Sequence, residues 1–233
     1  MKTKLFIFIL LFNFAAATQC GAQHTRETRG DHHDTNFRYC RIVHKNSNEY
    51  TGSPYLNKEF QTGDVIKIDS RIYNDQKLRY NIYEDQIEFK NKDTIRIVPG
   101  KSFTKSVRIG EKTFIYTDYI INGKNHFGIL EQLTKGNCSL YYRHKVDFEE
   151  AVKPSGYKEA KPANFMNVKG KFFIQITNKP IIDIHNKKHL LMQFPNKKKE
   201  IQKFIKTKKI NIKKKADLII LVQYCNELNK ASI

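Results

Sequence analysis

The sequence predicts a mainly β protein with α-helices at its C-terminus: an antiparallel meander, built as a curved sheet or partial barrel, followed by two or three short helices. Three observations support this class. Short runs rich in β-branched and aromatic residues recur from about residue 50 to 185. Turn residues separate the runs, and no alternation of strand and helix patterns occurs, as parallel strands would require. Beyond residue 186 the apolar residues recur at helical spacing instead.

Residues 1–22 have the pattern of a cleaved secretory signal peptide. A basic start precedes a short apolar run that ends at Ala17, and small residues follow as far as Ala22. The run is shorter than the roughly 20 residues that a membrane-spanning helix needs, so we expect no transmembrane span after cleavage. Cleavage after Ala22 and cleavage after Ala17 both fit the pattern. Gln19, directly before Cys20, argues against a lipid-modified cysteine.

Residues 23–49 are predicted to form a flexible leader, because residues 24–36 lack apolar periodicity and directly follow the cleavage site. This segment holds the only dense group of metal-capable side chains. Adjacent histidines on such a leader lack the fixed geometry of a dedicated metal centre, so we assign no metal site. The residues of this group are His24, Asp31, His32, His33 and Asp34.

The predicted β-rich region spans residues 50–185. Within it, Leu78, Tyr80 and Ile82 alternate with polar residues, as in a strand with one buried face. Tyr141 and Tyr142 are adjacent and must face opposite sides of their strand, so we expect one of them to be exposed, where it could stack on a ligand. Tyr116 and Tyr119 belong to the same candidate set. The predicted strands lie at 65–68, 78–83, 87–89, 95–98, 112–121, 125–133, 139–148, 167–177 and 180–184.

The basic region 186–233 is predicted to form helices that pack on the sheet. The first helix spans residues 186–194 and is closed by Pro195, and Asn196 can cap the second helix. A third helix covers about residues 215–229. Its apolar stripe has helical spacing and consists of Leu218, Leu221, Val222, Cys225 and Leu228.

Cleavage after Ala22 would leave three cysteines, and therefore at most one disulfide bond within the chain. An oxidising compartment permits a bond between Cys40 and Cys138, but the sequence leaves the pairing open. Cys225 lies in the apolar stripe, where a buried thiol acts as a small hydrophobic side chain. We therefore interpret it as a core residue and not as a nucleophile.

Three segments resemble an uncharacterised family of exported, β-rich proteins from Bacteroidota-type bacteria. They are LRYNIYEDQIEF at 78–89, YKEAKPA at 157–163 and DLIILVQYCNEL at 217–228. The resemblance covers the chain from about Tyr50 onward. It implies export and a β-rich body followed by short helices, and it carries over no activity and no binding residues.

Positive charge is concentrated in the last third of the chain. The formal net charge is +19; residues 151–233 contain 19 lysines, no arginine and five acids, whereas residues 23–150 contain 21 basic and 18 acidic residues. The candidate partners are an anionic envelope polymer or a lipid surface, and a solvated helix surface is the simpler alternative. The absence of arginine argues against sequence-specific nucleic-acid binding. The candidate polyanion-binding residues are Lys197, Lys198, Lys199, Lys213, Lys214 and Lys215.

No motif for catalysis or for cofactor binding is present, so we assign no catalytic residue and no cofactor. Neighbouring carboxylates, such as Glu84, Asp85 and Glu88, are interpreted as surface charge. The preferred hypothesis is an exported, non-catalytic binding or envelope-assembly protein in the periplasm or at the cell envelope. The alternatives are an envelope enzyme whose acid/base site is assembled only by the fold, and a weak polyanion-binding module that uses the lysine-rich C-terminus.

Overall fold

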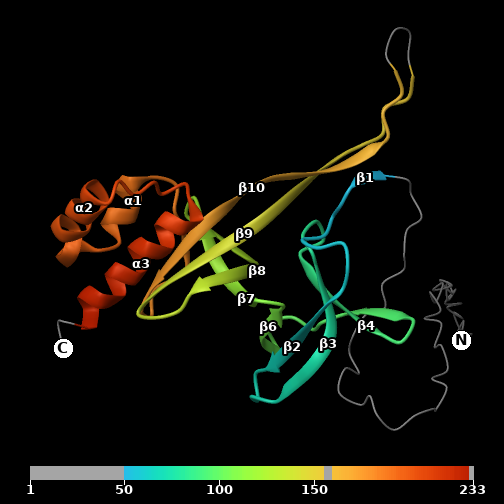
Figure 1. The fold of residues 1–233 in the computed structure, drawn as a ribbon, viewed down its shortest axis with the longest axis horizontal. Helices are drawn as coiled ribbons and strands as arrows, with labels where there is room; N and C mark the ends of the chain where they lie inside the picture. The colour runs from blue at the N-terminus through green and yellow to red at the C-terminus, as the bar shows by residue number, and fades with distance from the viewer. Residues whose placement is uncertain (1–49, 155–158, 231–233) are drawn as a thin grey trace, which may run out of the picture. The chain divides into compact units, whose positions relative to one another are not determined.

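The computed structural model describes residues 50–154 and 159–230 and confirms the predicted fold class. One mixed sheet of eleven strands is followed by three short α-helices (Figure 1). The predicted signal peptide and leader, with their histidines and Cys40, lie outside the described residues. The strands are β1 (Tyr50–Gly52), β2 (Gln61–Lys67), β3 (Ile72–Asn81), β4 (Gln86–Asn91), β5 (Thr94–Ile97), β6 (Thr104–Ile109), β7 (Lys112–Ile121), β8 (Lys124–Thr134), β9 (Cys138–Glu149), β10 (Ala163–Ile176) and β11 (Ile182–Asp183). The helices are α1 (Lys187–Met192), the 3₁₀ turn η2 (Pro195–Lys197), α2 (Lys198–Thr207) and α3 (Lys215–Lys230).

The strands follow the order β1-β10-β9-β8-β7-β6-β2-β3-β4-β5. Strand β11 pairs with both β10 and β7, so β7 to β11 close into a ring. The closing contact is a parallel pairing of Ile182 with Ile120, whose backbone N–H donates to Ile181 O at 2.8 Å. The pairings β1–β10 and β11–β7 are parallel and were not expected from a pure meander. Long stretches of chain separate both pairs, as parallel pairing requires.

The first half of the described chain has its own core, which lies between β2, β3, β4 and β6 and the neighbouring strands of the ring, β7 to β9. The predicted burial of Leu78, Tyr80 and Ile82 is confirmed, but Asn81 is buried too, so the alternation ends at Tyr80. Strand β6 was not predicted, because it offers only Val107 and Ile109 as apolar residues between polar neighbours. The buried residues of this core are Val65, Leu78, Tyr80, Ile82, Ile87, Phe89, Val98, Val107, Ile109, Phe114, Ile129 and Val146.

Strands β9 and β10 are covered on both faces. Tyr141 and Phe173 point into the ring, where they pack with Tyr119 and Leu130. The alternate residues, Leu140, Phe172 and Ile174, pack against the helices on the other face. The expectation that Tyr141 or Tyr142 is exposed is therefore wrong: Tyr141 is buried in the ring, and Tyr142 is half-buried against the helix-covered core, where its hydroxyl accepts a hydrogen bond from Gly170 N at 2.9 Å.

The helices match the predicted spans, with one difference in capping. Asn186 caps α1, since its Oδ1 accepts from His189 N at 2.8 Å. Asn196 does not cap α2 as expected: it lies inside η2, and Lys197 occupies the cap position without a side-chain hydrogen bond. The reason is that Pro195 starts a 3₁₀ turn that leads directly into α2.

Helix α3 presents its predicted stripe to the core. Leu218, Leu221, Val222 and Cys225 are buried against residues of β9 and β10. Burial raises the pKa of the Cys225 thiol to about 12, and Cys225 and Cys138 are both free thiols. The interpretation of Cys225 as a core residue is confirmed.

A single side chain fastens α3 to the start of β9. Asn226 Oδ1 accepts from Cys138 N at 2.7 Å, and Asn226 Nδ2 donates to Cys138 O at 2.9 Å. The amide thus pairs with the backbone as a neighbouring strand would, and it satisfies both polar groups of a residue whose side chain is fully buried.

We predict that Asn226→Ala lowers the free energy of unfolding by about 2–3 kcal/mol, because it leaves a buried N–H and a buried C=O without partners. Asn226→Asp keeps the acceptor but sets a carboxylate oxygen against Cys138 O in place of the donor, so at pH 7 its loss should be at least as large as that of Asn226→Ala. Urea unfolding followed by circular dichroism measures both. Equal stability of all three proteins would contradict the role given to this amide.

Candidate functional site

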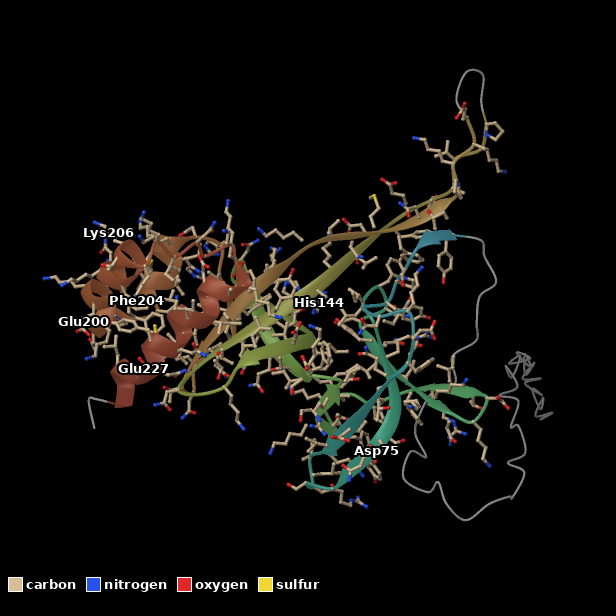
Figure 2. The ribbon with its side chains drawn as sticks, viewed as in Figure 1. Asp75, His144, Glu200, Phe204, Lys206 and Glu227 are labelled. Atoms are coloured by element: carbon tan, nitrogen blue, oxygen red, sulfur yellow. The ribbon has the colours of Figure 1, made fainter. Side chains whose placement is uncertain are left out.

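The lysines of the helical region lie mainly on its outer side. In α2, Lys199, Lys203 and Lys206 recur at i, i+4 and i+7, which places them on one exposed face. The opposite face of α2 buries Ile201 and Ile205. Figure 2 shows Lys206 at the outside of the helices, whereas Phe204 points inward. We call the exposed lysines from α2 to the start of α3, without the paired Lys215, the lysine surface: Lys198, Lys199, Lys203, Lys206, Lys208, Lys209, Lys213 and Lys214.

None of these lysines forms an ion pair with an acid among residues 50–154 and 159–230. The helical region from 187 to 230 contains 13 lysines and only three acids. Few of its lysine charges can therefore be neutralised by a nearby carboxylate of the same region. Like charges at i and i+4 on a helix each cost about 0.2–0.5 kcal/mol. The lysine surface therefore carries electrostatic repulsion that the rest of the fold must offset.

The helices that carry this surface are stacked on each other and on the sheet. The rings of Phe204 in α2 and Tyr224 in α3 stack with their centroids 3.9 Å apart and an interplanar angle of 5°. The linker between α2 and α3 is fixed as well, since Asn211 N donates to Asp217 Oδ2 at 2.7 Å. The lysine surface is thus displayed by a packed layer of helices.

A buried carboxylate joins this layer to the sheet. Glu131 of β8 is only 4% exposed. Its Oε1 accepts from Lys215 Nζ of α3 at 2.9 Å and lies 3.5 Å from Lys112 Nζ of β7. His144 Nε2 of β9, labelled in Figure 2, lies 2.6 Å from Glu131 Oε2. One carboxylate of β8 thereby contacts three other elements of the fold, β7, β9 and α3.

The pKa of Glu131 reflects these partners. Burial alone raises the pKa of a carboxyl group, but here the hydrogen bonds from His144 and Lys215, with the charges of both, outweigh it. The result is a pKa lowered from 4.5 to about 2. Glu131 is therefore ionised at neutral pH although it is buried.

The structure divides the six lysines singled out from the sequence. Lys198, Lys199, Lys213 and Lys214 belong to the lysine surface. Lys197 lies 4.0 Å from the carboxylate of Glu200. Lys215 is held by Glu131, so its charge is already paired and it acts as an anchor. Lys203 and Lys206 were missing from the candidate set, although their spacing from Lys199 was a readable signal.

The neighbouring carboxylates also differ from expectation. Glu84 is exposed, as surface charge should be. Glu88, however, is 1% exposed and forms a 2.6 Å ion pair with Arg79, whose guanidinium stacks 3.6 Å from the centroid of the Tyr55 ring. Asp85 is partly buried, and this burial raises its pKa. The surface-charge interpretation is therefore wrong for Glu88 and Asp85.

Within the described part of the chain, no cluster of three or more His, Cys, Asp or Glu side chains could hold a metal ion. The described helices also include none with the length and apolar character needed to cross a membrane. No protein-family model, curated protein or solved structure matches the chain.

We predict that Glu131→Gln lowers the free energy of unfolding by about 3 kcal/mol at pH 7. This is the free energy that corresponds to lowering the pKa of Glu131 from 4.5 to about 2. Because the folded-state pKa is depressed, this stabilisation is present above pH 4.5 and is lost as the pH falls through about 2. The gap between wild type and variant should shrink over that range. Urea unfolding at several pH values measures it.

The matched control is Glu111→Gln, which makes the same change at an exposed position and should alter stability by less than about 0.5 kcal/mol. A difference between wild type and Glu131→Gln that stays constant from pH 7 to pH 2 would contradict the electrostatic role of Glu131.

Proposed function

We propose that this protein is an exported, non-catalytic binding protein that holds an acidic linear polymer of the cell envelope on its lysine surface. The observation that carries the proposal is the run of exposed lysines on α2 and on the segment that leads into α3, without acidic partners among the described residues. Export and an envelope location are part of the proposal; they rest on the pattern of residues 1–22.

The chemistry of the surface favours an extended polyanion over a lipid bilayer. Helices that lie in a membrane interface present large apolar side chains to the lipid. The exposed residues of α2 are instead all polar: Lys198, Lys199, Glu200, Lys203, Lys206 and Thr207. A polymer with regularly spaced negative charges requires no insertion and gains from each lysine it passes.

The use of lysine without arginine indicates how selective the binding is. An ammonium group is a compact point charge, and it lacks the planar fork with which arginine recognises phosphate and carboxylate in two-point contacts. We therefore expect binding that follows charge density and tolerates differences in the polymer's repeat unit. The affinity should fall steeply with salt, because the Debye length is only about 10 Å at 0.1 M.

Binding of a polyanion would also relieve the repulsion between the lysines of α2. Neutralising the lysines with a polyanion removes the like-charge cost on α2 and stabilises the folded state by mass action. The anchoring of Lys215 by Glu131 separates the lysine that positions α3 from the lysines that remain available.

We predict that Lys199→Gln/Lys203→Gln/Lys206→Gln weakens binding to heparin, used as a probe polymer, by at least about tenfold at low salt. Each lost lysine contact should also lower the slope of log K against log salt by about 0.7, so the triple variant should lose about two in slope. Fluorescence titration over a range of salt concentrations measures both. Lys215 is left intact because its loss would loosen α3.

The control is Lys90→Gln/Lys105→Gln/Lys124→Gln, which removes the same charge from exposed positions of the sheet. It should bind within about twofold of wild type. Equal losses in the two triple variants would show that net charge alone attracts the polymer and would overturn the proposed site. Tighter binding to vesicles of anionic phospholipid or to single-stranded DNA than to acidic polysaccharide would overturn the proposed class of ligand.

A further inference from the structure

A second feature, independent of the lysine surface, is a pocket of about 340 Å³ between the β4–β5 hairpin and the β7–β8 hairpin. This volume lies within the usual range of small-molecule sites. Its walls are mainly apolar and aromatic, and Asp85 is the only ionisable side chain in its lining apart from the phenol of Tyr116. The walls are formed by Ile97, Val98, Tyr116, Phe127 and Ile129.

The carboxylate of Asp85 is held at the pocket by two donors. Tyr80 Oη donates to Asp85 Oδ1 at 2.7 Å, and Ile129 N donates to Asp85 Oδ2 at 3.2 Å. Asp85 itself has a left-handed backbone conformation, with φ of 51°, which orients its side chain at the end of the β3–β4 turn. Each carboxylate oxygen keeps a lone pair beyond these contacts.

Gly128 allows the carboxylate to take this position. A Cβ atom at residue 128 would lie 2.3 Å from Asp85 Oδ2 and 3.2 Å from the hydroxyl of Tyr119. Glycine therefore admits Asp85 to the edge of the pocket, between the core of the first half and the interior of the ring.

The charge of Asp85 is poorly compensated. Burial raises its pKa, although the two hydrogen bonds and the charge of Arg143 act in the opposite direction. Among the described residues Asp85 makes no ion pair, whereas the buried carboxylates of Glu88 and Glu131 have one and three basic partners. Ionisation of Asp85 therefore lowers the stability of the ligand-free protein. A cation bound to the carboxylate would restore that stability.

The aromatic side chains of the pocket suit a cation as well. Phe127 is 52% exposed, and the ammonium of Lys101 lies 5.8 Å from the centroid of its ring. The side chain of Lys101 is paired with Asp118 at the same place, so both of these charges are already neutralised. Tyr116 forms a second aromatic wall. Its hydroxyl donates a hydrogen bond to Val98 O at 3.3 Å, which fixes the position of the ring.

We propose that this pocket binds an organic ammonium ion that carries an apolar or aromatic group. The ammonium donates to the free lone pairs of Asp85 and lies against Tyr116 and Phe127, while the apolar group contacts Ile97, Val98 and Ile129. A neutral ligand of the same shape gains the apolar contacts but leaves the charge of Asp85 without a partner.

The test uses the full chain with phenethylammonium and its neutral isostere 2-phenylethanol as probes, and ligand-detected NMR titration at pH 7 as the measurement. We expect the ammonium to bind at least about tenfold more tightly than the alcohol. Asp85→Asn should remove this preference, while Asp93→Asn, the same change in the exposed turn between β4 and β5, should leave it intact.

Phe127→Ala provides a second variant, since Phe127 is half exposed and its loss disturbs the core little; it should weaken ammonium binding by about threefold to tenfold. Equal binding of the alcohol and the ammonium, or unchanged binding to a folded Asp85→Asn protein, would overturn the proposal. Absence of binding by both probes at millimolar concentration would overturn it too. None of these outcomes bears on heparin binding, so the two proposals fail separately.

Discussion

The placement of the C-terminal helices depends on one buried charge, that of Glu131. An ionised carboxylate that is 4% exposed is tolerated only when basic groups surround it, and here they come from β7, β9 and α3. Such a cluster contributes little net stability compared with an apolar core of the same volume, but removing one member is costly. Its effect is to select one position of α3 on the sheet, and the double hydrogen bond of Asn226 selects the same position.

This arrangement gives lysines of one region two different roles. Lys215 pairs with the buried carboxylate of Glu131. By contrast, Lys199, Lys203 and Lys206 remain exposed on the outer face of α2. A strongly basic segment without buried apolar residues would be a solvated chain. Held by the core that α1, α2 and α3 share with β9 and β10, the same residues form a surface with fixed spacing. Fixed spacing reduces the ordering cost of binding an extended polyanion.

Patterns within one element could be predicted from the sequence. The strand 112–121 was predicted at its observed bounds, and the stripe that contains Cys225 was assigned to the core as observed.

Properties set by distant residues could not be predicted. Glu131 is surrounded by partners 13, 19 and 84 residues away, and no local pattern indicates their meeting. Tyr142 was misjudged for the same reason, because helices from much later in the chain cover its side of the sheet. The pocket at Asp85 likewise needs two hairpins, and only the contact with Gly128 explains how the carboxylate reaches it.

The central claim, that a fixed lysine surface binds an acidic polymer, is tested most directly by lysine footprinting. The folded protein is acetylated briefly with and without heparin, and the extent of modification of each lysine is read by mass spectrometry. The account predicts that heparin protects Lys199, Lys203 and Lys206 far more than the exposed sheet lysines Lys90, Lys105 and Lys124. Protection spread evenly over both sets, or strongest on the sheet, would contradict it.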